Sequence, residues 1–480
     1  YGGLAVTGQA SPDGNSDLGS GSGAVNEGFS QYLRGYWQLQ ELTTDEAIIA
    51  WGENDNPTIK DLNFNTWNAD NVYTAALFAR IFFQVGLCNE FLRETTDSKL
   101  SERGVSGTLR QEIQGYRTEA RFLRALSYYH GIEIFGKVPF ATDADLFGTA
   151  PNMQSRQFVF DYIISELNAI EPELSGARGG AYYGRATKAA AWMLLAKLYL
   201  NAQVYIGADR SALALENVNK VIGSGYTLAT INEGETYGKL FMADNDTNGA
   251  ENEAIFTVNF DGILTKSWGG MTYLVHASCG PVVAPSLGID FAWQGFRPRQ
   301  EFFERVGADK RVITPSTDSS PLSITNYLVF DQGKKAIKFS NKRSDGTNGK
   351  SLEHCDADFP MFRLADAYLM YAELAVVNGQ GSRGQALEYV NALRTRAGEA
   401  TDTDGDLTAD FILDERAREL YWEGHRRQDL IRFGKYLSGH NWQWKGGTQT
   451  GATLSNHLLV FPIPNRELKS NSKLSQNTGY

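Results

Sequence analysis

The sequence predicts a mostly helical, all-α protein in which tetratricopeptide-like helix pairs support a large loop-rich insertion with short β strands. Apolar residues recur at helical spacing on both sides of the insertion. The hexapeptides ALENVN (214–219) and ALEYVN (386–391) each follow a long apolar helix after a short Gly-containing turn. Between them, the chain from about 240 to 358 offers only short β-like runs. Recurrent helix pairs of this kind bury one another's apolar faces, as in a solenoid.

We interpret residues 1–480 as a single domain with two halves. The helical scaffold is expected mainly at 30–42, 71–235 and 359–440, and the loop-rich binding half mainly at 43–70 and 240–358. The first 28 residues are rich in Gly, Ser and Asn, which predicts a surface loop after one short helical turn.

The helices follow from the spacing of apolar residues. Helical patterning begins near Ser30 and recurs from Asn71 to Leu92. Further helices are expected at 111–135, 155–173, 187–206, 211–223, 361–378, 383–397 and 408–436. Gly424 interrupts the last pattern, so we expect two helices that meet at a corner there. The runs AIFTVNF (254–260) and NYLVF (326–330) are predicted to be strands.

The composition excludes several classes of function. Lys and Arg number 45 against 56 Asp and Glu, a net charge of −11, and nucleic-acid backbones need a basic surface. We expect no apolar run long enough to span a bilayer. The three cysteines are too few and too scattered for a disulfide framework or a zinc site.

The most densely charged stretch, 412–436, supports two interpretations. In a helix, Glu415, Glu419 and Glu423 fall on one line beside arginines. Such carboxylates could serve catalysis or metal binding, or they could form a buried ion-pair lattice. A glycoside hydrolase needs two carboxyl groups across a cleft, roughly 5 to 9.5 Å apart, and one helix does not supply that geometry alone. We therefore interpret this stretch as a brace and expect no enzymatic activity.

Two glycine-containing motifs are similar to parts of known ligand sites. Gly379, Gly381 and Gly384 form a G-x-G-x-x-G, but an amphipathic helix precedes it where a dinucleotide site requires a strand, so we predict a helix–helix turn. The run DNDTNG (244–249) fits the first half of a calcium loop. Ile255 stands where the closing Glu of an EF-hand belongs, which excludes that motif.

A different, structural calcium site remains a hypothesis, and we expect no other cofactor. Its candidate ligands are Asp246 and a carboxylate from Asp356 or Asp358. The alternative for this segment is a solvated Asx turn.

Aromatic residues in non-helical segments are the candidate binding residues. They are Trp51, Trp268, Tyr273 and Trp293. Flat rings suit sugars, whose C–H faces stack on them while the hydroxyl groups find polar partners such as Arg34 and Asn54. Core packing of any one ring is an equally good interpretation, and several rings together favour a binding face. A tetratricopeptide adaptor that binds a peptide is a third alternative.

Several segments together resemble the SusD family (SusD/RagB-like) of outer-surface glycan-binding lipoproteins from Gram-negative gut bacteria. The matching stretches are EARFLRALSYYHGIEIFGKVPF (119–140), GRATKAAAWMLLAKLYLNAQVY (184–205), FPMFRLADAYLMYAEL (359–374), ERARELYWEGHRRQDLIRFG (415–434), and the terminal FPIP and QNTGY. The resemblance implies an all-α assembly of tetratricopeptide-like helix pairs under a loop-rich half that binds glycan.

The chain is most similar to the starch-binding branch of that family, through TTDEAIIAW, LFMADND, WGGMTYLV and WKGG. That resemblance implies an aromatic arc for α-glucans with Trp268 and Trp293 as members, and sugar contacts from Arg34 and Asn54. The branch has another arc Trp where this chain has Ile49, with Trp51 two residues on. We therefore expect an arc that is weaker, shifted or suited to another glycan. The LFMADND match also supports calcium at Asp246.

Membership in this family would also imply where the protein is located and which partner it has. The resemblance implies a lipidated Cys upstream of Tyr1, so that the membrane is contacted only through this anchor at the outer-membrane cell surface. It implies a SusC-like TonB-dependent transporter as partner, which receives captured starch or maltooligosaccharides. It implies no catalysis.

Overall fold

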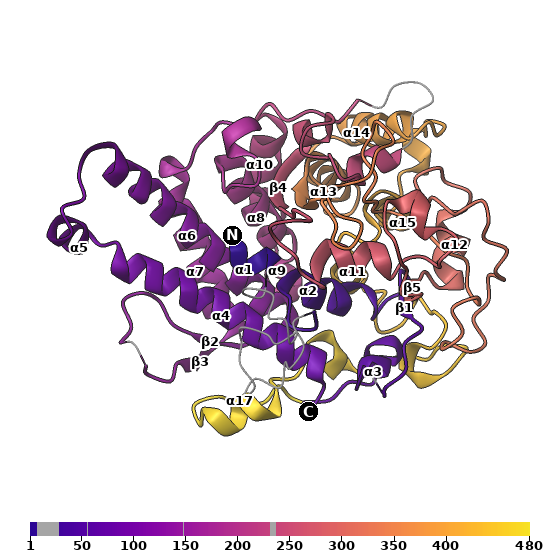
Figure 1. The fold of residues 1–480 in the computed structure, drawn as a ribbon, viewed down its shortest axis with the longest axis horizontal. Coiled ribbons are helices and arrows are strands. Elements are labelled where there is room, and N and C mark those ends of the chain that lie inside the picture. The colour runs from indigo at the N-terminus through magenta and orange to yellow at the C-terminus, as the bar shows by residue number, and fades with distance from the viewer. Residues whose placement is uncertain (7–27, 55, 147, 231–236) are drawn as a thin grey trace.

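The computed structural model describes residues 1–6, 28–54, 56–146, 148–230 and 237–480. Helices form the left and upper parts of the molecule, and a loop-rich half with few regular elements occupies the right side (Figure 1). The expected mostly helical fold with a loop-rich insertion is confirmed. Most of the predicted N-terminal loop lies outside the described residues, and the short helical turn before it is α1 (Gly2–Ala5).

The first part of the scaffold is a series of packed helices. They are α2 (Tyr32–Glu41), α3 (Ile59–Phe64), α4 (Val72–Glu94), α5 (Asp97–Glu102), α6 (Gly107–Phe135), α7 (Arg156–Ile170), α8 (Lys188–Leu200), α9 (Ala202–Ile206) and α10 (Ser211–Ile222). Helix α6 packs against both α4 and α7, and α8 packs against α10. Side-chain caps fix where several begin, since Asn71 accepts hydrogen bonds from the backbone N–H groups of Tyr73 and Thr74.

The second part of the scaffold follows the insertion. It contains α13 (Leu364–Val376), α14 (Arg383–Arg396), α15 (Ala409–Leu420), α16 (Arg426–Arg432) and the short α17 (Asn465–Ser470). Helix α13 packs against α10, which joins the two parts. The G-x-G-x-x-G motif spans the turn between α13 and α14 and the start of α14, and Gly379 and Gly381 in the turn have φ of 67° and 90°. The prediction of a helix–helix turn is confirmed, because this left-handed backbone favours glycine.

Three antiparallel two-stranded sheets connect distant segments. Strand β1 (Ile48–Ile49) pairs with β5 (Phe296–Arg297), β2 (Val138–Phe140) with β3 (Asn152–Gln154), and β4 (Ala254–Val258) with β6 (Phe359–Arg363). Strand β4 comes early in the insertion and β6 leads directly into α13, so their pairing closes the insertion at its base.

Two predictions within the insertion are wrong. The run 326–330 is not a strand but a series of turns, because the Asn326 side chain accepts a hydrogen bond from the N–H of Leu328 and its backbone carbonyl accepts one from Val329. The insertion also contains two helices that were not predicted, α11 (Gly270–His276) and α12 (Gln300–Val306). Each has seven residues, too few for helical periodicity to stand out.

One described helix, α4, is long and apolar enough to cross a membrane by length and composition. In the structure 61% of its most apolar window is buried inside the protein. Helices α2 and α6 pack against it, so it is a core helix of the scaffold.

The charged stretch forms the predicted corner. Helix α15 ends at Leu420 and α16 begins at Arg426, and Gly424 between them has φ of 81°. A Cβ atom at Gly424 would stand 2.6 Å from the ring of Tyr36, so only glycine fits beside α2.

Buried ion pairs surround this corner. Glu419 accepts hydrogen bonds from Arg311 (3.1 Å), Arg363 (2.6 Å) and Arg396. Glu423 pairs with Arg363 (2.6 Å) and Lys338 (2.7 Å). Although burial opposes it, these cations hold the pKa of Glu419 and of Glu423 below the usual range. The predicted brace is therefore confirmed, and its carboxylates form ion pairs with arginine and lysine.

The brace also reaches the loop-rich half. Arg426 of α16 makes a bidentate pair with Asp45, at 2.7 Å for both contacts, just before β1. Glu41, at the end of α2, accepts hydrogen bonds from the N–H groups of Gly424 and His425. Burial raises the pKa of Glu41 to about 7.

Replacing Glu419 by glutamine should strongly destabilise the protein. The neutral amide leaves three buried arginines with less negative charge, and breaking one partner of a buried ion pair costs about 3–5 kcal/mol. We expect a loss of this size in the free energy of unfolding, measured by urea denaturation. Glu216→Gln, in the exposed Lys220–Glu216 pair, is the control and should leave that free energy nearly unchanged. Equal effects of the two variants would contradict the role of the brace.

Glu41 should make stability depend on pH. Its folded-state pKa of about 7 lies above the ordinary value of 4.5, so its stabilising contribution is complete below about pH 4.5 and is lost as the pH rises through about 7. The melting temperature should therefore fall across this window. Glu41→Gln, whose amide oxygen still accepts from Gly424 and His425, should flatten that slope. An unchanged slope in Glu41→Gln would assign the pH dependence to another group.

Candidate glycan-binding site

Three half-buried tryptophans form a row on the loop-rich half. The ring centroids of Trp268 and Trp293 lie 6.1 Å apart, and those of Trp293 and Trp51 also lie 6.1 Å apart. All three rings are partly accessible to solvent. We call Trp268, Trp293 and Trp51 the aromatic row. The sequence analysis named all three, and the structure brings Trp51 to the other two, which lie more than 200 residues further along the chain.

The backbone around α11 holds the row in place. Trp268 precedes α11, and the N–H of Trp293 donates to the carbonyl of His276 at the end of that helix (2.8 Å). The Trp51 indole N–H donates to the carbonyl of Trp293 (3.3 Å), and the N–H of Ala50 donates to the carbonyl of Gly295 (2.8 Å). Each ring is therefore attached to a paired backbone segment.

Tyr273 and Arg34 lie beneath the row. Both side chains are buried, and the Arg34 guanidinium stands 4.2 Å from the centre of the Tyr273 ring and 5.8 Å from that of Trp51. The Tyr273 ring packs against Trp51 and Trp293, and its hydroxyl accepts a hydrogen bond from Gln38 (3.1 Å). In this arrangement the two residues support the rings from below.

The last two positions that the sequence analysis discussed, Ile49 and Asn54, lie on either side of Trp51 in the chain. Asn54 is exposed in the turn that follows Trp51. Ile49 is fully buried in β1, where the Asn63 side chain bonds its N–H and its carbonyl. Position 49 therefore offers no surface to a ligand, and Trp51 is the ring that this segment contributes.

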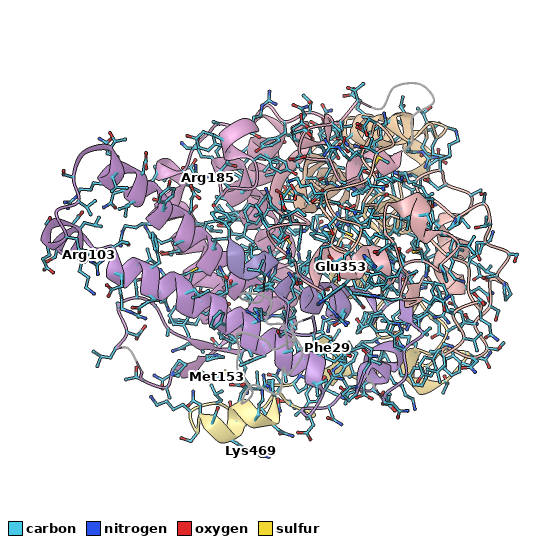
Figure 2. The ribbon with its side chains drawn as sticks, viewed as in Figure 1. Phe29, Arg103, Met153, Arg185, Glu353 and Lys469 are labelled. Atoms are coloured by element: carbon cyan, nitrogen blue, oxygen red, sulfur yellow. The ribbon has the colours of Figure 1, made fainter. Side chains whose placement is uncertain are left out.

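Sequence reasoning missed three further rings that contact the row, of which only Phe291 is exposed. Phe291 is 37% exposed and lies 6.2 Å from Trp268 and 6.4 Å from Trp293. His354 lies 4.5 Å from Trp268, and His276 is buried 5.2 Å from Trp293. Figure 2 labels Glu353, the neighbour of His354, within the loop-rich half. The alternation in FAWQGF could have indicated Phe291, whereas nothing in the sequence links His354 to Trp268.

The charges of the three candidate calcium ligands influence one another, but the three carboxylates differ in burial. Burial raises the pKa of Asp358 to about 7, and the charges of Asp246 and Asp356 add to this shift. Asp356 accepts hydrogen bonds from the backbone N–H groups of Gly262 and Lys350, while Asp246 is exposed. Within the described ranges, no three His, Cys, Asp or Glu side chains form a group that could hold a metal ion. These carboxylates alone therefore do not make a complete site.

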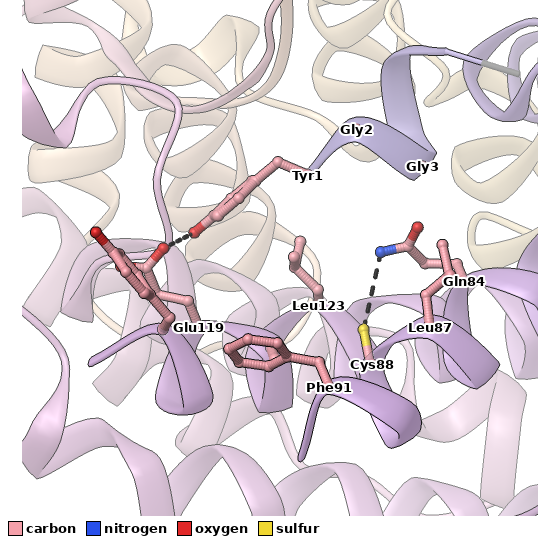
Figure 3. Close-up of a pocket in the computed structure, with 11 residues that line it drawn as sticks. Tyr1, Gly2, Gly3, Gln84, Leu87, Cys88, Phe91, Glu119 and Leu123 are labelled. Atoms are coloured by element: carbon pink, nitrogen blue, oxygen red, sulfur yellow. Dashed lines mark hydrogen bonds between the residues drawn. The ribbon is translucent and has the colours of Figure 1, made fainter. Parts of the chain in front are cut away.

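A cavity of about 430 Å³ lies elsewhere, between α1, α4 and α6. Figure 3 shows Phe91, Cys88 and Leu123 facing this space, with Tyr1 hydrogen-bonded to Glu119 at one end. No residue of the aromatic row lines it. Its walls are mainly apolar side chains of the scaffold, and the polar Glu119 at its end is already hydrogen-bonded to Tyr1.

The aromatic row offers apolar ring faces on which a ligand could stack. Neighbouring rings tilt by 45° and 58°, so they present a curved rather than a flat face. Burial lowers the pKa of His276 to about 4, so this ring is neutral at physiological pH and acts as packing beneath Phe291 and Trp293. A curved apolar face with polar groups at its margin is suited to an oligosaccharide.

Two family models match the chain. One, described as "SusD family", matches residues 323–480, and one described as "Starch-binding associating with outer membrane" matches residues 33–200. Among curated proteins, the starch-binding protein SusD of Bacteroides thetaiotaomicron is 35% identical, in an alignment that covers 100% of this chain and 91% of that protein.

Solved structures share the fold. A surface glycan-binding protein A from Bacteroides fluxus has a TM-score of 0.72 at 22% identity and covers 96% of this chain and 98% of its own. A laminarin-binding SusD-like protein has a TM-score of 0.70 at 21% identity, covering 93% of this chain and 94% of its own.

The helix-pair scaffold, the two family models and the full-length similarity agree with one another. This chain belongs to the SusD family.

Proposed function

We propose that this protein is a non-catalytic surface receptor that captures α-glucans, such as starch and maltooligosaccharides, on its aromatic row. The observation that carries this proposal is the pair of 6.1 Å spacings that joins Trp268, Trp293 and Trp51 into one accessible, curved face. The full-length similarity to a protein named as starch-binding supports the choice of α-glucan.

The absence of catalysis in this proposal rests on where the candidate acids lie. A glycosidase acid and its partner must face each other across an accessible cleft. Glu415 and Glu419 are fully buried, and Glu423 is nearly so. All three pair with arginines, which supports a structural role for them.

A second candidate is the same role for another glycan. The structural neighbour named as laminarin-binding has the same fold, so the fold does not fix the linkage. The burial of Ile49 means that this chain forms its row with Trp51, and the curvature of that row need not match a starch helix.

The cellular role that we propose is delivery to a transporter. The family description places its members in association with the outer membrane. We infer a lipid anchor upstream of Tyr1 and a SusC-like TonB-dependent transporter as partner, with this protein handing over captured oligosaccharide. Co-purification of the anchored protein with such a transporter from detergent-solubilised outer membranes tests this step, and recovery without any transporter would contradict it.

Replacing row residues should weaken glycan binding strongly. Trp268→Ala and Trp293→Ala each remove a stacking face, and loss of an aromatic anchor at a binding surface typically costs at least about 2 kcal/mol, or about thirtyfold in affinity. Calorimetry with maltoheptaose measures this. Trp192→Ala, in scaffold helix α8, is the control and should leave the affinity unchanged. Full binding by both row variants would refute the site, and tight binding of laminarin alone would favour the second candidate.

We also propose, as a separate prediction, that calcium stabilises the segment around Asp246, Asp356 and Asp358. The charges of Asp246 and Asp356 disfavour ionisation of Asp358, and a bound cation would relieve that repulsion. Addition of calcium after chelation should raise the melting temperature of the wild type and not that of Asp358→Asn. Identical melting curves of the wild type with chelator and with calcium would end the calcium hypothesis.

A further inference from the structure

A cavity of about 360 Å³ opens beside the aromatic row. Phe330, Val283 and Pro315 form apolar parts of its wall, and Gln294, Thr317 and Asp331 form polar parts. Gln294 follows Trp293 directly in the chain, so the cavity adjoins the backbone segment that holds the row, while none of the three row rings lines it. We call this cavity the Gln294 pocket.

The segment that joins the row to the pocket has an unusual backbone conformation at Gln294. Gln294 has φ of 52°, in the left-handed region that residues other than glycine rarely adopt. Two hydrogen bonds impose this conformation, from the N–H of Gln294 to the carbonyl of Cys279 (3.2 Å) and from the N–H of Gly295 to that of Ala277 (2.9 Å). A strained backbone conformation of this kind persists only where the surrounding structure holds it in place. Such residues concentrate at ligand sites.

The opposite wall is fixed by a buried cation. The Lys335 ammonium donates hydrogen bonds to Ser320 Oγ and to the Gly333 carbonyl, both at 2.9 Å. It also lies 4.5 Å from the centre of the Phe330 ring, and the N–H of Lys335 donates to Asp318 (2.7 Å). The Phe330 ring is therefore held in position at the edge of the pocket.

Three polar side chains of the pocket are available to a ligand. Across the part of the chain that the structure describes, the Gln294 amide, the Thr317 hydroxyl and the Asp331 carboxylate make no hydrogen bond to another protein group. Together they offer donors and acceptors around an apolar ring. A neutral polyhydroxyl ring requires this combination, since it has apolar C–H faces and a rim of hydroxyl groups.

We propose that the Gln294 pocket binds one further hexose unit of a glycan that is stacked on the aromatic row. The pocket therefore makes affinity depend on glycan length, because only an oligosaccharide that extends past Trp293 reaches it. This inference rests on the proposed glycan-binding function and adds a second contact region to it.

Gly280 allows the pocket to be filled without touching the row. A Cβ atom built at Gly280 would lie 3.6 Å from the Gln294 amide nitrogen and 3.7 Å from the Phe330 ring, which is ordinary contact. The Gly280 backbone is not in the left-handed region, so a larger side chain is tolerated there. Gly280→Leu should therefore place its side chain in the pocket.

Calorimetry with maltotriose and maltoheptaose tests the proposal. We expect the wild type to bind maltoheptaose more tightly, and Gly280→Leu to lower the affinity for maltoheptaose about tenfold while maltotriose changes less than about twofold. The double variant Gln294→Ala with Asp331→Ala removes polar partners without filling space and should act in the same direction. Gly176→Leu, at an exposed glycine with open space around it, is the control.

The outcomes separate this inference from the proposed function. Absence of α-glucan binding by the wild type would refute the proposed function and the inference with it. Wild-type binding with an unchanged preference for maltoheptaose in Gly280→Leu and in the double variant would refute the pocket alone. Equal loss for both sugars would assign the effect to the row. If circular dichroism shows that Gly280→Leu is unfolded, the double variant decides.

Discussion

The buried ion pairs around α15 and α16 are the constraint on which the rest of the structure depends. They join charges from distant elements at one corner: Arg311 and Lys338 from the insertion, Arg363 from the end of β6, Arg396 from α14, and Asp45 from the segment before β1. A loop-rich half has few backbone ladders of its own, so its position must come from side chains. Here charge-assisted hydrogen bonds hold the loop-rich half against the helical scaffold.

The same corner is connected to the aromatic row through α2. Trp422 follows α15, and its N–H and indole N–H donate to Glu46, which lies just before β1. The Trp422 ring packs against Phe296 of β5 and Trp37 of α2, and both of these rings contact Tyr273 beneath the aromatic row. The row is thus the outer end of a continuous column of aromatic rings that begins at the brace.

The long helices of the scaffold were predictable from the sequence, because they keep one apolar period, whereas the six-residue helices α3, α5 and α17 were not predicted. The corner at Gly424 and the turn at Gly379 were predictable as well, since glycine in a helical pattern has a defined consequence. The structure of the insertion was not predictable in the same way. Helices α11 and α12 are short, and the 326–330 run has the composition of a strand but forms Asx-type turns. Trp268, Trp293 and Trp51 could be named from their loop context. Their spacing, and the burial of Tyr273 and Arg34, depend on contacts across more than 200 residues, which no local pattern records.

The hydrogen bond from the Trp51 indole to the Trp293 carbonyl has a consequence for selectivity. One ring from the segment after β1 and one from the insertion are joined by this hydrogen bond before any ligand arrives, so little side-chain freedom remains to be lost on binding. A rigid face of this kind selects among the shapes that a flexible glycan samples in solution, and it favours chains whose resting curvature already matches its own. Discrimination among sugars made of the same units would then arise from polymer conformation more than from individual hydroxyl groups.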